Sequence, residues 1–159
     1  MKMKQTKYIL YIFFLPFLST YGQKAQMEVF VSGVEFKIVK CYGESSTNKV
    51  TIECIATNTN EFTNEVRTAG IPKAYDEFGS EVIIINKTGG WLNLFGGTSR
   101  MASLSNGIPI RGKILLSQVS KSSRFISILQ FDARVSSEGQ KRVPPWEKCE
   151  FRLIPIEWR

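Results

Sequence analysis

The sequence predicts an all-β protein that folds as an antiparallel β-sandwich of about 7–9 strands. Three observations support this fold class. Short segments with alternating apolar and polar residues, the period of a half-buried strand, recur along the chain. Turn-forming residues separate these segments, and beyond the N-terminal region no segment repeats its apolar residues at helical spacing. Many short strands of this kind favour two packed sheets, with a closed barrel as the alternative.

The N-terminal segment has the three parts of a secretory signal peptide, predicted to span residues 1–22. A lysine-rich start precedes an apolar run from Tyr8 to Leu18, and small residues follow, so we expect cleavage after Gly22. A retained membrane anchor is the alternative, but a spanning helix needs roughly 20 apolar residues, about twice this run. The first cysteine, Cys41, lies too far along the chain for lipidation just behind the signal.

The remainder of the chain, residues 23–159, is predicted to form a single domain. The 159 residues less the first 22 leave 137, a length that suits one hydrophobic core. No later apolar segment is long enough to cross a bilayer, so no integral membrane segment is expected after cleavage. These features predict a protein that is secreted across the inner membrane and resides in the periplasm or outside the cell.

Seven segments of the mature chain are predicted strands: Val34–Ile38, Val50–Ala56, Glu65–Thr68, Glu81–Asn86, Ile110–Val119, Arg124–Val135 and Cys149–Ile156. Between the third and the fourth, Asp76-Glu77-Phe78-Gly79 has the composition of a tight turn. Asp76 and Glu77 could also contact calcium. That ion takes about six to eight oxygen ligands, however, and no loop offers such a set. We therefore interpret this pair as turn-forming and predict no metal site and no cofactor.

Charge is distributed unevenly along the mature chain. Without the three signal lysines, the 21 basic residues become 18, and against 14 acidic residues the net charge is +4. Residues 23–81 carry 6 basic and 9 acidic side chains, whereas residues 82–159 carry 12 and 5. A basic half can attract polyanions such as envelope polysaccharide or anionic lipid. A solvated face is the favoured interpretation, and nucleic acid is not an expected partner because no reading motif is present.

The mature chain has three cysteines, and oxidising surroundings would favour one disulfide among them. Cys41 and Cys54 lie at matching distances from one loop, so a Cys41–Cys54 bridge is the favoured pairing, with Cys149 as an alternative partner for either. In a simple hairpin, that pairing sets the Phe36 face opposite a polar face. A bulge near Val39–Cys41 would resolve the conflict; otherwise the two strands are not direct partners.

Several motifs resemble a secreted bacterial domain family of unknown function with a telokin-like, immunoglobulin-type sandwich. The run Val34–Asn58 has that family's Cys, short loop, Val-Thr-x-x-Cys strand and following Asn. Further similarities lie at Lys73–Val82, at Asn106–Ser120 and in the closing strand at Cys149–Trp158. The resemblance implies an immunoglobulin-like strand arrangement, and it implies no catalytic residues.

The residue types argue against an enzyme. The chain contains no histidine, which excludes Ser-His-Asp and Cys-His centres and histidine-based zinc sites. A Ser-x-x-Lys spacing occurs at Ser46–Lys49, but it lies in a predicted loop and not on a helix, where residues three apart share a face. We therefore predict no catalytic residues.

Two aromatic segments are candidate binding loops. Trp91 and Phe95 lie between paired glycines, which allow unusual backbone conformations, and Arg100 is a basic neighbour. Trp146 follows two prolines in a stiff turn. In both segments, burial of the aromatic rings in the core is the alternative interpretation.

Two functions fit these observations. The first is an exported, non-catalytic module of the bacterial envelope or exterior that binds an unidentified protein or glycan. The second is a structural or stress-protective envelope protein without a dedicated ligand site. The first requires an aromatic side chain that is exposed beside Arg or Lys.

Overall fold

The computed structural model describes residues 24–85, 101–137, 140 and 142–159, and for residues 69–71 and Met101 the backbone alone. The predicted signal peptide at residues 1–22 therefore lies outside the described residues. Ten strands make up the described part: β1 (Glu28–Val31), β2 (Val34–Glu44), β3 (Lys49–Asn58), β4 (Asn64–Asp76), β5 (Glu81–Ile84), β6 (Met101–Leu104), β7 (Ile110–Ser117), β8 (Phe125–Ser137), β9 (Glu147–Pro155) and β10 (Glu157–Trp158). The all-β prediction is confirmed, and each of the seven predicted segments overlaps a strand, although the predicted bounds differ by a residue or more at several ends.

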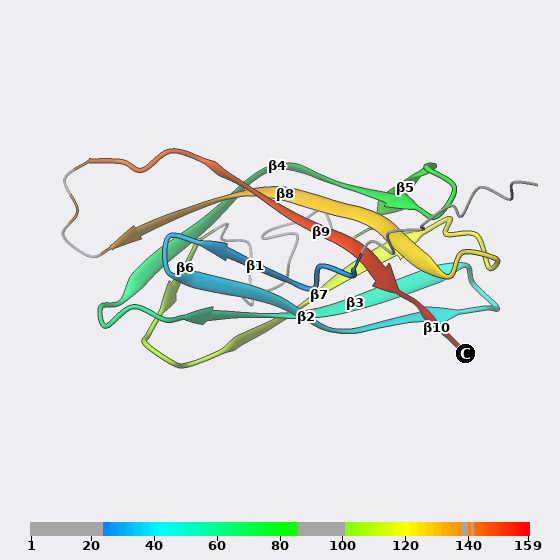
Figure 1. Cartoon of the computed structure of the whole chain (residues 1–159), viewed down its shortest axis with the longest axis horizontal. Coiled ribbons are helices and arrows are strands. Elements are labelled where there is room, and N and C mark those ends of the chain that lie inside the picture. Colours follow the sequence, from blue (N-terminus) through cyan, green and yellow to red (C-terminus); the bar gives the residue numbers. More distant parts are fainter. Residues whose placement is uncertain (1–23, 86–100, 138–139, 141) are drawn as a thin grey trace, which may run out of the picture.

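The strands pair in the order β1-β2-β3-β7-β5-β4-β8-β9, with β6 on β4 and the short β10 parallel to β2. All pairs except β10–β2 are antiparallel. The order β2-β3-β7-β5 has the connectivity of immunoglobulin strands A-B-E-D, and β4-β8-β9 that of C-F-G. The chain thus forms an antiparallel β-sandwich with immunoglobulin-type strand order (Figure 1).

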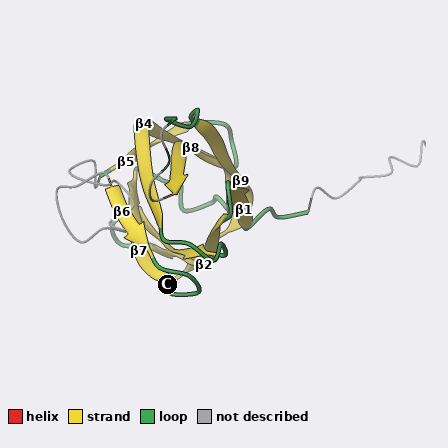
Figure 2. Ribbon diagram, turned by 90° about the vertical axis from the view of Figure 1, so that its left-hand side faces the viewer, coloured by secondary structure: helices red, strands yellow, loops and turns green. Residues whose placement is uncertain are grey.

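The two sheets are joined at both edges. On one side β5 pairs with β4 and also with β7, so it belongs to both layers. On the other side, Gln26 and Arg152 exchange two backbone hydrogen bonds of 2.9 and 3.2 Å, which attach the segment before β1 to β9. Viewed from one end, the strands surround the interior (Figure 2). These links give the sandwich some of the closure of a barrel and leave fewer open edges.

One hydrophobic core fills the space between the sheets. Inward-facing side chains alternate with outward-facing ones along β3, β7 and β8, as the sequence pattern predicts. The largest side chains that are fully buried are Phe151, Ile52, Leu104, Ile114, Leu116, Ile126, Leu129 and Ile154.

A bulge in β2 keeps both halves of that strand on the core. The register with β3 shifts between Ile38 and Lys40, and the side chains of Val39 and Lys40 are both exposed. The extra residue restores the inward orientation of Cys41, so the apolar faces on either side of the bulge are both buried. The structure therefore resolves the register conflict through a bulge between direct strand partners.

The predicted Cys41–Cys54 disulfide is wrong, because all three cysteines are free. The bulge pairs Cys41 with Ile52 and Cys54 with Ile38, which makes the two cysteines diagonal neighbours across the strands. Diagonal positions lie about 7–8 Å apart, too far for a bridge without backbone movement. Cys149 pairs with Phe131 on the other sheet. Burial raises the pKa of each of the three thiols to about 12, so each is a neutral core side chain.

We predict that the folded protein resists alkylation. Only the thiolate reacts, and a thiol pKa raised from 9.0 to about 12 keeps Cys41, Cys54 and Cys149 protonated at pH 8–9. Mass spectrometry after iodoacetamide treatment without reductant should show no adducts on the folded protein and three adducts after denaturation. A single adduct after denaturation would reveal a disulfide and contradict the assignment.

The C-terminal strand β10 is held against β2 by a close packing contact. The indole N–H of Trp158 donates to the carbonyl of Ser123 at 2.7 Å, and backbone bonds join Arg159 to Gly43 and Ser45. A Cβ atom on Gly43 would collide with the Trp158 ring. Glycine at this position therefore lets the ring lie across the strand.

Gly43→Ala should destabilise the fold by about 1–3 kcal/mol, because the added methyl overpacks the contact with Trp158. Urea unfolding should show this as a lower midpoint at unchanged slope. The double variant Gly43→Ala/Trp158→Leu is the control, and it should recover part of the loss. If the single variant unfolds like the wild type, the contact is not close.

Candidate functional site

Four connections meet at one end of the sandwich, on the left of Figure 1. They are the β1–β2 turn and the β3–β4, β6–β7 and β8–β9 loops. This loop end carries exposed apolar side chains from three of them, namely Phe62, Ile108, Val143 and Trp146. Exposed apolar side chains that gather on connecting loops mark a surface that could bind a partner.

A buried amide network holds the loop end together. The side-chain nitrogen of Asn58, at the end of β3, donates to the carbonyls of Phe62 (2.7 Å) and Leu104 (2.8 Å). Its side-chain oxygen accepts from the backbone N–H of Asn60 (3.0 Å) and from the side-chain nitrogen of Asn64 (2.8 Å). Asn58 is fully buried and makes four hydrogen bonds. It thereby joins the β3–β4 loop to the start of β4 and the end of β6.

The network extends to the β6–β7 loop and to β8. The backbone N–H of Gly107 donates to the carbonyl of Asn58 at 2.8 Å. The hydroxyl of Ser137 donates to the side-chain oxygen of Asn64 at 3.0 Å, and these two residues are cross-strand partners. The ends of β4 and β8 are thus joined to the Asn58 network by a part-buried polar contact.

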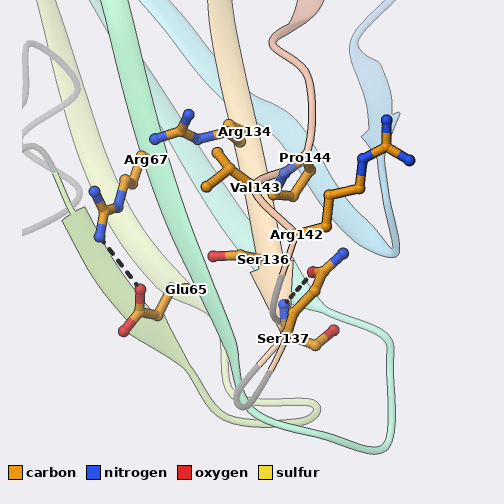
Figure 3. Close-up of a pocket in the computed structure, with 9 residues that line it drawn as sticks. Glu65, Arg67, Arg134, Ser136, Ser137, Arg142, Val143 and Pro144 are labelled. Atoms are coloured by element: carbon orange, nitrogen blue, oxygen red, sulfur yellow. Dashed lines mark hydrogen bonds and ion pairs between the residues drawn. The ribbon is translucent and has the colours of Figure 1, made fainter.

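A shallow groove of about 280 Å³ opens beside this network (Figure 3). Its lining comes from β4, from β8 and from the β8–β9 loop: Glu65, Arg67, Arg134, Ser136, Ser137, Gln140, Arg142, Val143 and Pro144. In Figure 3 the side chains of Glu65, Arg67, Arg134 and Ser136 project to the same side, whereas the guanidinium of Arg142 points away from them. The groove therefore has two guanidinium groups at its mouth.

These two arginines belong to a row that crosses three segments of the sheet. Arg67 on β4 and Arg134 on β8 are direct cross-strand partners. Trp146 directly precedes the Ala133–Glu147 pair of the β8–β9 ladder, which places it beside Arg134. The Arg134 guanidinium lies over the Trp146 ring, 4.4 Å from its centroid. We call Arg67, Arg134 and Trp146 the arginine–tryptophan row.

The charge at the row is only partly balanced. Like charges directly opposite each other on neighbouring strands repel, and Arg67 and Arg134 have this arrangement. Glu65 lies 3.6 Å from Arg67, but both side chains are over two-fifths exposed, so water screens this pair. On the same face, Asp132 is the cross-strand partner of Lys148. An anion placed between the two guanidinium groups would relieve their repulsion.

The predicted site residues have different outcomes. Trp146 is 44% exposed and lies against an arginine, as the binding hypothesis requires. Trp91, Phe95 and Arg100 lie outside the described residues, so their predicted role stays a prediction. Sequence reasoning missed Arg67 and Arg134, although their alternation with buried valines along two predicted strands showed that they face outward.

The Asp76–Glu77 pair forms a turn at the opposite end, as predicted. The Asp76 carboxylate accepts from the N–H groups of Phe78 and Ser80, both at 2.9 Å. Hydrogen bonds from Arg124 lower the pKa of Glu77. Across the described ranges, no group of three or more acidic or cysteine side chains could hold a metal ion. Nor is there, in the same residues, a helix long and apolar enough to cross a membrane.

Comparison with known proteins adds little to this description. No family model and no curated protein matches the chain. Among solved structures, it is similar to a FixG-related protein from Vibrio parahaemolyticus and to a DUF4426 family protein from Pseudomonas aeruginosa. Both are 11% identical to this chain, with a TM-score of 0.38. The match to the FixG-related protein covers 79% of this chain and 98% of that protein. The match to the DUF4426 family protein covers 86% of this chain and 100% of that protein. Such distant similarity does not bear on function, and the telokin-like family assignment stays a prediction.

Asn58→Ala should destabilise the protein by about 3 kcal/mol or more, because several buried or part-buried polar groups lose a hydrogen-bond partner. Asn106→Ala, an exposed asparagine in the neighbouring loop, is the matched control and should change stability little. Urea unfolding measures both. Equal midpoints for the two variants would show that the amide network contributes nothing.

Proposed function

We propose that the protein is an exported, non-catalytic interaction module of the bacterial envelope or cell exterior, which binds a protein or a glycan through its loop end. The observation that carries this proposal is the exposed Trp146 ring stacked on Arg134. Exposed Trp and Arg side chains are enriched at the centres of binding surfaces, because they combine contact area with directional hydrogen bonds.

The strand pairing under the row supports the proposal. Arg67 and Arg134 lie on β4 and β8, which pair along most of their length, and the Asn58 network joins the ends of the same two strands through Asn64 and Ser137. A surface that is already ordered loses less conformational entropy on binding. The exposed Phe62, Ile108 and Val143 side chains would extend the contact area around the row.

The proposal of a non-catalytic role rests on residue chemistry. The chain lacks histidine, and the three cysteine thiols are buried with a pKa of about 12. Glu65, the carboxylate of the groove, is paired with Arg67. A general base poised near neutral pH would require a raised pKa in an enclosed site, and the groove is open.

Export is the part of the proposal that rests on sequence alone. The lysine-rich start, the apolar run and the small residues before Gln23 support secretion across the inner membrane, to the periplasm or beyond.

A pull-down from the producing cell's envelope tests the proposal. Trp146→Ala should lose most of the partner that the wild type recovers, because truncation removes the central aromatic contact. Trp91→Ala tests the second predicted loop in parallel. Phe78→Ala is the matched control, since Phe78 is an exposed aromatic residue in the β4–β5 turn at the opposite end. Equal recovery by all four proteins would contradict the interaction module and favour the structural or stress-protective role.

A further inference from the structure

We infer that the arginine–tryptophan row binds an acidic saccharide, with a sugar carboxylate between Arg67 and Arg134 and the sugar ring against Trp146. This inference rests on the proposed function and names the ligand class of that site.

The arginine pair supplies the charge recognition. The β4–β8 register places Arg67 and Arg134 opposite each other on adjacent strands, so both guanidinium groups can reach one ligand. A guanidinium presents N–H donors in a planar fork that matches a carboxylate. Glu65 holds Arg67 at 3.6 Å through an exposed, screened contact, so a ligand carboxylate can share that guanidinium without removing a buried partner.

Trp146 supplies a surface for a sugar ring. Pyranose rings present patches of C–H groups that pack on aromatic side chains, while their hydroxyl groups remain free for hydrogen bonds. Trp146 retains 44% of its surface exposed although Arg134 covers part of the ring. The stacked guanidinium also limits the motion of both side chains, which lowers the entropy lost on binding.

The groove itself favours a saccharide over a protein partner. Its volume of about 280 Å³ lies just below the range of small-ligand sites, roughly 300–1,000 Å³, and suits a ligand of one or two sugar units better than a large one. Ser136, Ser137 and Gln140 line it with hydroxyl and amide groups that suit a polyhydroxylated ligand. A protein partner would need a desolvated pocket for an apolar anchor. The apolar lining here is limited to Val143, itself 69% exposed, and Pro144.

Binding to three polymers of known composition tests the inference: polygalacturonate, neutral dextran and poly-glutamate, measured by calorimetry on the processed protein. We expect binding to polygalacturonate and not to dextran, with poly-glutamate weaker. Arg134→Gln and Trp146→Ala should each weaken polygalacturonate binding about tenfold or more, the loss expected for one charged hydrogen-bonded contact or one aromatic contact. Arg134→Lys should give an intermediate loss, since it keeps the charge but not the fork.

Arg111→Gln is the matched control. Arg111 is an exposed arginine on β7, in the other sheet, so its substitution removes the same charge away from the row. If Arg111→Gln and Arg134→Gln weaken binding equally, attraction is a property of overall charge and the site assignment is wrong. If poly-glutamate and polygalacturonate bind equally and Trp146→Ala binds both as the wild type does, the inference of a saccharide ligand is wrong. The row would then be an anion site without saccharide specificity.

Failure of this inference can be told apart from failure of the proposed function. If no polymer binds but Trp146→Ala loses a partner in the envelope pull-down, the module stands and its ligand is of another class. If no polymer binding depends on Trp146 and the pull-down depends on neither Trp146 nor Trp91, both proposals are wrong. Circular dichroism of each variant checks that the β-sheet content is unchanged.

Discussion

The loop end of this sandwich depends on the four hydrogen bonds of Asn58. An unpaired amide costs free energy in a core, so the buried side chain of Asn58 specifies where its partners must lie. Those partners come from the β3–β4 loop, from β4 and from β6. Through Asn64 the same network reaches Ser137 at the end of β8. One buried side chain thereby joins the loop that follows it to the distant end of β6 and, through Asn64, to the end of β8.

For the proposed function, the relevant consequence is that strand pairing sets the positions of Arg67 and Arg134 in the absence of a ligand. Arg67 and Arg134 are held opposite each other by the register of β4 and β8, at the cost of their mutual repulsion. Such a local conflict is expected at a functional site and is not needed for the fold, because any neutral polar pair would serve the sheet equally well. The Trp146 ring, which packs on Arg134, adds an aromatic surface next to the charged pair.

The alternating pattern of the chain was enough to predict the strands that face the core. It predicted β2, β3 and β7 because each has one buried face and one solvated face. It missed β1, β6 and β10, which are short elements that pair with the longer strands β2 and β4. It predicted β4 too short, because that strand continues through Pro72, a residue that ordinarily marks a strand boundary.

The candidate site was less predictable than the fold. Trp146 could be proposed from composition, but its neighbour Arg134 could not, because their contact depends on the register of β8 with β9. The disulfide was predicted wrongly for a related reason. The register of β2 with β3 pairs Cys41 with Ile52 and Cys54 with Ile38, so the two cysteines are not opposite each other, and alternation alone does not reveal the register between strands.

Amide hydrogen exchange at Asn60 and Gly107 is the most direct test of the central claim, that a buried amide network pre-orders the loop end. Both backbone N–H groups donate to Asn58, one to its side chain and the other to its carbonyl. If the network is formed in the folded protein, these two loop amides should be protected to the same degree as amides in the centre of β3. Exchange at the rate of an open surface loop would contradict the account.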